Sequence, residues 1–239
     1  MMIKGVLIDY GGTIDTNGLH WGSVLWDAYQ KFDVGITKEQ FSKAYSFGER
    51  SLAINPIIKP SHSFYDTLEL KIEQQFQFLK ENGSDLPHEL IKSIAKECND
   101  FALATVRKAK PVLQELANQY PVILVSNFYG NINRVLEVFE IESFFQEIIE
   151  SAVVKVRKPD PKIYQLGVEA LGLTPEECVV IGDSFTKDIV PAKTIGCKAI
   201  WINVAGWEDT TVNHAGPYQA DAEIKDFSEV QAIINQLNK

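Results

Sequence analysis

The sequence has few cysteines and no long hydrophobic run. Its three cysteines, Cys98, Cys178 and Cys197, lie far apart, and no two of them have the spacing of metal ligands. We therefore expect reduced thiols in the core. No apolar run approaches the ~18 residues that a membrane-spanning helix needs, and the run near the N-terminus is too short for a signal peptide. These absences predict a soluble cytoplasmic protein.

Basic residues are also scarce relative to acidic ones. The 239 residues include 23 Lys plus Arg and 32 Asp plus Glu, which gives a net charge of −9. This balance disfavours nucleic acid and anionic membranes as partners, because both are negatively charged. Hydrophobic residues make up 45% of the chain, so a chain of this length can fill a sizeable core.

Short apolar runs without polar alternation recur along the chain, as in strands buried on both faces of a parallel sheet. Apolar residues at helical intervals separate several of them, which is a β–α alternation typical of a doubly wound α/β layer. The runs predict about six strands, at residues 5–8, 122–125, 144–150, 179–181, 199–204 and 220–224, with helices at 112–118 and 160–171.

The region after the first predicted strand has a different pattern of apolar residues. Helical periodicity at residues 21–32, 38–47, 63–79 and 86–109 predicts an all-helical insertion, and Trp26, Tyr29 and Phe32 read as the core stripe of its first helix. The predicted fold is a Rossmann-like, doubly wound parallel sheet with an inserted helical cap. The core comprises residues 1–16 and 111–239, and the cap comprises 17–110, with hinges near Asn17 and Lys110.

An insertion at this point lies over the carboxyl ends of the strands, where open α/β sheets bind ligands. Polar residues fall at the same edge of the predicted sheet. Each has an ordinary alternative role, as a helix cap, a turn residue or a solvated lysine. Their convergence from separate segments indicates a site formed by Asp9, Ser126, Asn127, Lys158, Asp183 and Asp188.

The segments that carry these residues resemble the motifs of the haloacid dehalogenase superfamily of hydrolases, which is dominated by phosphatases. The matching segments are IDYGGT (8–13), VSN (125–127), KPDPKIY (158–164) and GDSFTKD (182–188), in the family's order. The resemblance spans residues 6 to about 204, and the helical insertion matches the family's first type of cap.

The resemblance implies an Mg²⁺-dependent attack on a small phosphorylated molecule. Asp9 would be the nucleophile that forms an aspartyl-phosphate. The metal would be held by Asp9, the main-chain carbonyl of Gly11 and Asp183, which are hard oxygen donors. Lys158 would supply positive charge to the transferring phosphoryl group.

The remaining motif residues have supporting roles in the family. Ser126 and Asn127 would hydrogen-bond the phosphoryl oxygens, and Thr13 would shape the turn that brings the backbone close to them. Asp188 would lie outside the metal's ligands and orient Lys158 or a bound water.

The sequence departs from the family at position 11. Most of its phosphatases read DxDGT, where the second aspartate protonates the leaving oxygen and then activates water. Gly11 has no such group, although strand alternation places it on the same face as Asp9 and directs Tyr10 away. General acid–base catalysis is worth ~10² to 10⁴ in rate, so we expect weak turnover or restriction to activated leaving groups.

Several alternatives remain. The 2-haloacid dehalogenases read DxYGT, but here the tyrosine comes one position early. The phosphonoacetaldehyde hydrolases read DxAGT and use a cap lysine as a Schiff base; cap lysines here include Lys31, Lys38, Lys43, Lys59 and Lys71. A non-catalytic protein of the same fold that binds a phosphorylated ligand or another protein is a third possibility.

Three residues near the entry to the insertion could replace the missing acid. They are Asp15, His20 and Asp27, and His20 beside Trp21 could face the cleft. A capping or packing role is the simpler interpretation of each.

Overall fold

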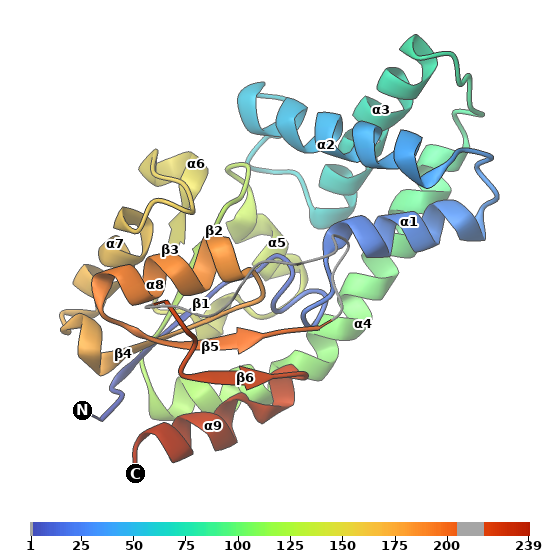
Figure 1. Cartoon of the computed structure of the whole chain (residues 1–239). Helices are drawn as coiled ribbons and strands as arrows, with labels where there is room; N and C mark the ends of the chain where they lie inside the picture. The colour runs from blue at the N-terminus through green and yellow to red at the C-terminus, as the bar shows by residue number, and fades with distance from the viewer. Residues whose placement is uncertain (1, 205–217) are drawn as a thin grey trace.

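A six-stranded parallel sheet lies at the centre of the computed structural model, which describes residues 2–204 and 218–239 (Figure 1). The strand order is β3-β2-β1-β4-β5-β6, and every neighbouring pair is parallel. The predicted strands are confirmed. They are β1 (Gly5–Ile8), β2 (Val122–Ser126), β3 (Glu147–Glu150), β4 (Cys178–Gly182), β5 (Lys198–Ile202) and β6 (Ala222–Ile224).

Helices cover both faces of the sheet because successive strand residues point to opposite sides. Val6 and Ile8 belong to the core layer that contains the C-terminal half of α4 (Leu90–Gln119). Leu7 faces the other layer. The first layer also includes α5 (Ile132–Val138) and α9 (Val230–Leu237), and the second includes α7 (Lys162–Leu171) and α8 (Val190–Ile195).

Short helical segments complete the connections between these elements. They are α6 (Ser151–Val154), the 3-10 turns at Glu142–Phe144, Pro175–Glu177 and Phe227–Glu229, and a π-type turn at Phe185–Ile189. The π-type turn follows β4 directly and carries Asp188 toward the carboxyl edge of the sheet.

The insertion after β1 is all-helical, as predicted, and forms a separate lobe beyond the carboxyl edge of the sheet (Figure 1). Its helices are α1 (Trp21–Lys31), α2 (Lys38–Ile54), α3 (Phe64–Glu81) and the N-terminal part of α4. The aromatic stripe of α1 packs in the core of this lobe, where the Tyr29 hydroxyl donates to Gln75 at 2.7 Å.

Helix α4 differs from the sequence expectation. The pattern indicated two helices separated near Lys110, whereas α4 runs from Leu90 to Gln119 through Pro111. One buried face continues across this point from Val106 to Leu113, and proline removes only one backbone donor. Because α4 belongs to both lobes, the division of the chain at residues 17 and 110 remains our proposal.

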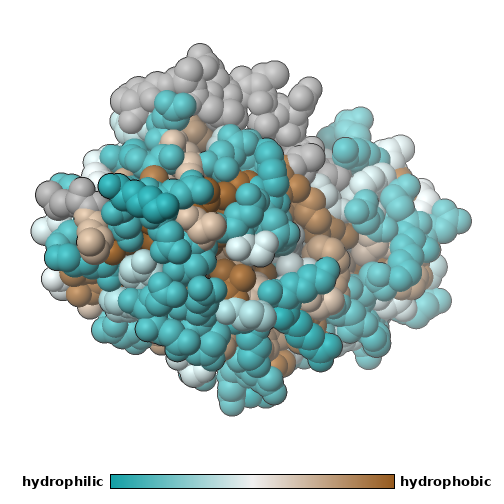
Figure 2. Space-filling view, turned by 90° about the horizontal axis from the view of Figure 1, so that it is seen from below, coloured by the Kyte–Doolittle hydropathy of each residue, from teal (hydrophilic) through white to brown (hydrophobic). Residues whose placement is uncertain are grey.

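The three cysteines are buried and free, as expected. Over residues 2–204 and 218–239, no helix combines the length and the hydropathy needed to span a bilayer. The face shown in Figure 2 is mostly hydrophilic, with small hydrophobic patches between the charged side chains. The apolar residues are thus used mainly inside the two core layers and the helical lobe.

Candidate active site

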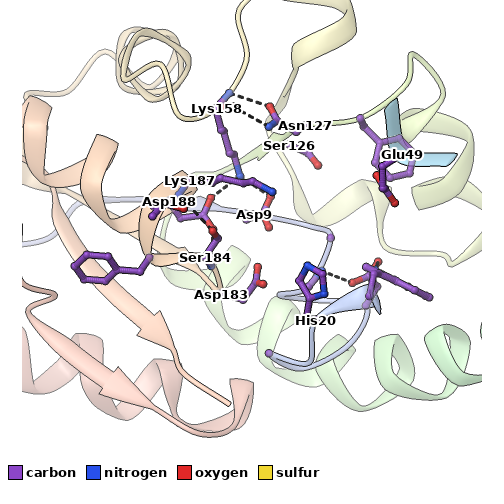
Figure 3. Close-up of a pocket in the computed structure, with 18 of the residues that line it drawn as sticks. Asp9, His20, Glu49, Ser126, Asn127, Lys158, Asp183, Ser184, Lys187 and Asp188 are labelled. Carbon is purple, nitrogen blue, oxygen red and sulfur yellow. Dashed lines mark hydrogen bonds and ion pairs between the residues drawn. The ribbon is translucent and has the colours of Figure 1, made fainter. Parts of the chain in front are cut away.

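The carboxyl edge of the sheet brings together residues from three neighbouring strands. Ile8, the last residue of β1, is in register with Leu124 of β2 and Ile181 of β4. Asp9 follows immediately, and its amide donates to the Ile181 carbonyl at 3.0 Å. Asp9 therefore lies between Ser126 at the end of β2 and Asp183 just after β4, and all three line one cavity (Figure 3).

An acidic cluster with a single lysine occupies the floor of this cavity. Ligand oxygens of Asp9, Asp183 and Asp188 all lie within 4.8 Å of one another, so the cluster could hold a metal ion. The Lys158 ammonium contacts both Asp9 and Asp188, at 2.8 Å from the latter, and is almost completely buried. Asp9 and Asp188 therefore share the charge of Lys158, and the half-buried Asp183 lies beside them.

Burial and mutual repulsion shift the protonation of this cluster. Burial raises the pKa of Asp9 to about 6, with Lys158 opposing the shift and Asp188 adding to it. Burial, followed by the charges of Asp9 and Asp188, raises the pKa of Asp183 well above its usual range. Burial lowers the pKa of Lys158, but the negative charges of Asp188 and Asp9 raise it by more. The net shift is upward, so this lysine stays protonated.

Asp188 contacts the Lys158 ammonium and is itself held by further hydrogen bonds. Its Oδ1 accepts from Lys158 Nζ and from the Tyr164 hydroxyl at 2.7 Å, and its Oδ2 accepts from the Ser184 amide at 3.0 Å. Lys158 Nζ also lies 5.2 Å from the centroid of the Tyr164 ring. Tyr164 is part of the KPDPKIY segment, but its spacing gave no signal of this contact.

Asn127, expected to bind the phosphoryl oxygens, and Thr13, expected to shape the nucleophile turn, both hydrogen-bond other residues of the site. The Asn127 side chain accepts from the Lys158 amide at 2.9 Å and donates to the Lys158 carbonyl at 3.1 Å (Figure 3). The fully buried Thr13 hydroxyl lies 3.2 Å from Asp9 Oδ2 and 3.1 Å from Asp183 Oδ1. Asn127 thus fixes the lysine's backbone, and Thr13 fixes the two acids.

The two glycines after Tyr10 differ sharply in their surroundings. A Cβ at Gly11, which lines the cavity, would meet nothing within 4 Å. Gly12 has φ +96, and a Cβ there would overlap the Asp183 carboxylate. Position 11 thus has room for a side chain, whereas position 12 requires glycine. Tyr10 points away, as expected, and packs edge-on against Phe64 and Phe128.

This difference predicts opposite outcomes for two alanine substitutions. We expect Gly11→Ala to change the free energy of unfolding by less than about 0.5 kcal/mol. Gly12→Ala should destabilise the protein by roughly 1 to 3 kcal/mol, because it combines a left-handed backbone with a clash against Asp183. Urea unfolding of both variants measures the difference, and equal stabilities would contradict the geometry.

Of the three substitute acids considered, Asp15 is the one tied directly to the nucleophile loop. Its fully buried carboxylate accepts from the Gly12 amide at 2.7 Å and from Trp21 Nε1 at 3.0 Å. It therefore connects this loop to the first residue of α1. His20 lines the cavity and caps α1 by accepting from the Gly22 amide at 3.0 Å, whereas Asp27 is exposed on α1.

The burial of Asp15 has a consequence for stability. Burial raises the pKa of Asp15 to about 7 from 3.8, although the Gly12 amide and Trp21 oppose the shift. Since the folded state holds this proton more tightly than the unfolded state, stability should fall as pH rises from about 4 to 7. The expected loss is roughly 4 kcal/mol, from 1.36 kcal/mol per unit of pKa shift.

Urea unfolding at several pH values checks this for Asp15→Asn. The decline between about pH 4 and 7 should be shallower in the variant, with the contributions of Asp9 and Asp183 remaining, so its stability relative to the unmodified protein should increase over that range. The exposed Asp27→Asn on α1 is the matched control and should leave the pH dependence unchanged. An identical slope in Asp15→Asn would show that Asp15 is ionised in the folded state.

The cap supplies the opposite wall of the cavity, whose volume is about 430 Å³. The cap contributes Glu49 from α2 and Lys71 from α3 to this wall, and Tyr129 from the loop after β2 of the core lies beside them. Sequence reasoning gave no role to Glu49 or Tyr129 and named Lys71 only as one of several cap lysines. Neither charge nor periodicity distinguishes them from solvated or packing residues in the sequence.

Comparison with known proteins agrees with this geometry. The model of the haloacid dehalogenase-like hydrolases matches residues 3–196. A glyceraldehyde 3-phosphate phosphatase from Pyrococcus abyssi is 28% identical over 191 residues, which cover 71% of this chain and 79% of that protein. The protein of the same name from Pyrococcus furiosus is 22% identical over 228 residues, with coverages of 87% and 92%.

A solved structure shares the fold. The HAD-hydrolase YfnB from Bacillus subtilis, in a magnesium-bound form, is 17% identical with a TM-score of 0.60, covering 98% of this chain and 100% of that one. The sheet, the inserted helical lobe and the ordered motifs at the carboxyl edge all agree with the family match. The chain thus belongs to the haloacid dehalogenase-like hydrolase family.

Proposed function

We propose that this hydrolase is an Mg²⁺-dependent phosphatase that acts on small phosphorylated molecules through an aspartyl-phosphate on Asp9. The observation that carries the proposal is the buried Asp9 between Lys158 and Asp183, at the floor of a cavity that residues of the cap also line. Relatives with phosphatase names over most of the chain support the same reaction class.

The charge of the site fits a hard divalent cation. The buried carboxylates of Asp9 and Asp188 contact Lys158, and the half-buried Asp183 lies beside them. Burial first, and then repulsion within this cluster, raises the pKa values of Asp9 and Asp183. Asp9, Asp183 and the Gly11 carbonyl would hold Mg²⁺, which prefers oxygen ligands. The cation, when bound, would neutralise charge on the nucleophile and on the phosphoryl oxygens.

Each residue of the site would then have a separate role in the reaction. A carboxylate oxygen of Asp9 would attack phosphorus and displace the leaving oxygen, and water would later cleave the aspartyl-phosphate. Lys158, held by Asp188 and Asn127, would stabilise charge on the transferring oxygens, while the Ser126 hydroxyl would bind them. With Gly11 in place of an acid, the leaving group would depart without a proton from position 11.

The test is phosphate release from acetyl phosphate and p-nitrophenyl phosphate, with Mg²⁺ and with a chelator. Both substrates have good leaving groups and therefore need the missing acid least. We expect slow turnover that requires Mg²⁺. Absence of release from both substrates, in a folded protein that binds Mg²⁺ by calorimetry, would favour the non-catalytic ligand-binding alternative.

The state of Lys71 weighs against the phosphonoacetaldehyde-hydrolase alternative. This cap lysine lines the cavity, but its ammonium lies 2.6 Å from Glu49 Oε1. Although burial opposes the charge, Glu49 raises the pKa of Lys71 above its usual range. A Schiff-base lysine needs the opposite shift, because the neutral amine is the nucleophile.

A further inference from the structure

The cap wall of the cavity carries a compact polar cluster, which we call the cap triad: Glu49, Lys71 and Tyr129. Lys71 Nζ donates to Glu49 Oε1 at 2.6 Å, and the Tyr129 hydroxyl donates to Glu49 Oε2 at 2.7 Å. Lys71 Nζ also lies 5.4 Å from the centroid of the Tyr129 ring. The three residues come from α2, α3 and the loop after β2, so the triad joins the cap to the core.

The triad remains accessible from the cavity. The Glu49 side chain is 32% exposed while that of Lys71 is 9% exposed, and both line the cavity. Figure 3 shows Glu49 on the side of the cavity away from Asp188, so the triad is separate from the acidic floor. Tyr45 is a third hydrogen-bond partner of this carboxylate, whose two oxygens together offer about four acceptor positions, so Glu49 can still accept from a ligand.

The charge of the triad restricts what it can bind. Although burial opposes ionisation, Lys71 lowers the pKa of Glu49, and Glu49 raises that of Lys71. The pair is therefore ionised and nearly neutral by itself, so the pair adds little attraction for a second phosphate or an ammonium group. Lys187, which lines the same cavity, also acts on Glu49 through its charge. The pair does offer a strong acceptor, and hydrogen bonds to charged groups are stronger than those between neutral groups.

Aromatic side chains line the same cavity. Tyr129 and Tyr45 interact with Glu49, and Trp21 and Phe64 are also part of the cavity wall. Burial is the main cause that raises the pKa of Tyr45, and the charges of Glu49, Tyr129 and Asp183 add to it. Tyr45 therefore interacts electrostatically with both the triad and the acidic floor. A ligand anchored at the floor can thus extend along Tyr45 toward Glu49.

We propose that the cap triad selects phosphomonoesters of polyhydroxylated compounds, with a substrate hydroxyl donating to Glu49 and C–H faces packing on the aromatic rings. This inference rests on the proposed phosphatase function and names the substrate class of the same site. Neutral hydroxyl groups match the compensated charge of the pair, and the cavity of about 430 Å³ has room for a phosphoryl group with a short polyol chain.

Calorimetry with Mg²⁺ tests the proposal by comparing sorbitol 6-phosphate with hexyl phosphate, which has the same chain length and no hydroxyls. Glu49→Gln/Lys71→Met removes both charges without leaving either one unpaired, so the cap should stay folded. In this variant we expect the dissociation constant of sorbitol 6-phosphate, divided by that of hexyl phosphate, to rise by at least about tenfold. Loss of one hydrogen bond to a charged acceptor implies a change of this size.

Glu39→Gln/Lys43→Met is the matched control, because this ion pair lies exposed on α2 outside the cavity. It should leave the ratio unchanged. An equal ratio in the unmodified protein and the triad variant, both shown to be folded by circular dichroism, would overturn the proposal. Failure of the phosphatase proposal is separate: it would appear as absent release from acetyl phosphate, whatever the two dissociation constants.

Discussion

Replacing Asp9 by asparagine is expected to reduce Mg²⁺-dependent phosphate release from acetyl phosphate by at least about 10⁴, because the amide cannot form the aspartyl-phosphate. Asparagine has the same shape, and Lys158 keeps its contact with Asp188. The fold should therefore survive. Steady-state assays, together with detection of covalent phosphate on the unmodified protein after acid quenching, measure the effect.

The same substitution at Asp27, which is exposed on α1, provides the control and should leave the rate unchanged. Unfolding in urea should show that the Asp9→Asn variant is at least as stable as the metal-free unmodified protein near neutral pH, since burial disfavours the ionised Asp9. Turnover retained in Asp9→Asn at more than about a hundredth of the original rate would rule out Asp9 as nucleophile.

The second large effect should come from restoring an acid at position 11. A Cβ at Gly11 would meet nothing within 4 Å, and Gly11 lines the cavity, so we expect aspartate to be accommodated there. We expect Gly11→Asp to raise kcat for esters with poor leaving groups by ~10² to 10⁴, the usual worth of general acid–base catalysis. Acetyl phosphate, with its good leaving group, should gain less in its first step.

Gly11→Asn is the matched control, because it adds a side chain of the same shape that has no carboxyl proton. The dependence of kcat on leaving-group pKa, measured with a series of aryl and alkyl phosphates, should become shallower only in Gly11→Asp. If both variants accelerate turnover equally, the gain comes from filling space. If neither does while Asp9-dependent turnover persists, another group supplies the proton.

Much of the architecture was readable from the sequence because it depends on local patterns. Apolar runs without alternation identified the buried parallel strands, and helical periodicity identified the inserted lobe. The expected break near Lys110 was the exception. The apolar face of α4 continues from Val106 to Leu113, and packing against both lobes keeps the helix intact through Pro111.

Position along a strand also indicated which residues would meet. Residues that follow parallel strands share one edge, and on that basis Asp9, Lys158, Asp183 and Asp188 were expected together. The hydrogen-bond partners of each side chain did not follow from the sequence. Asn127 binds the backbone of Lys158 while also lining the cavity, and Thr13 bridges Asp9 and Asp183, so both hydrogen-bond the catalytic candidates.

The sequence by itself therefore determined the sheet, the helical insertion, the family motifs and the missing acid at Gly11, since each depends on residue type and short-range spacing. Only the tertiary structure decided that Tyr164 supports Asp188, that Asp15 is buried beneath the nucleophile loop, and that Glu49, Lys71 and Tyr129 meet across the cavity. Glu49 is 22 residues from Lys71 and 80 from Tyr129 in the chain. Contacts at such separations depend on how whole helices pack, which no local pattern records.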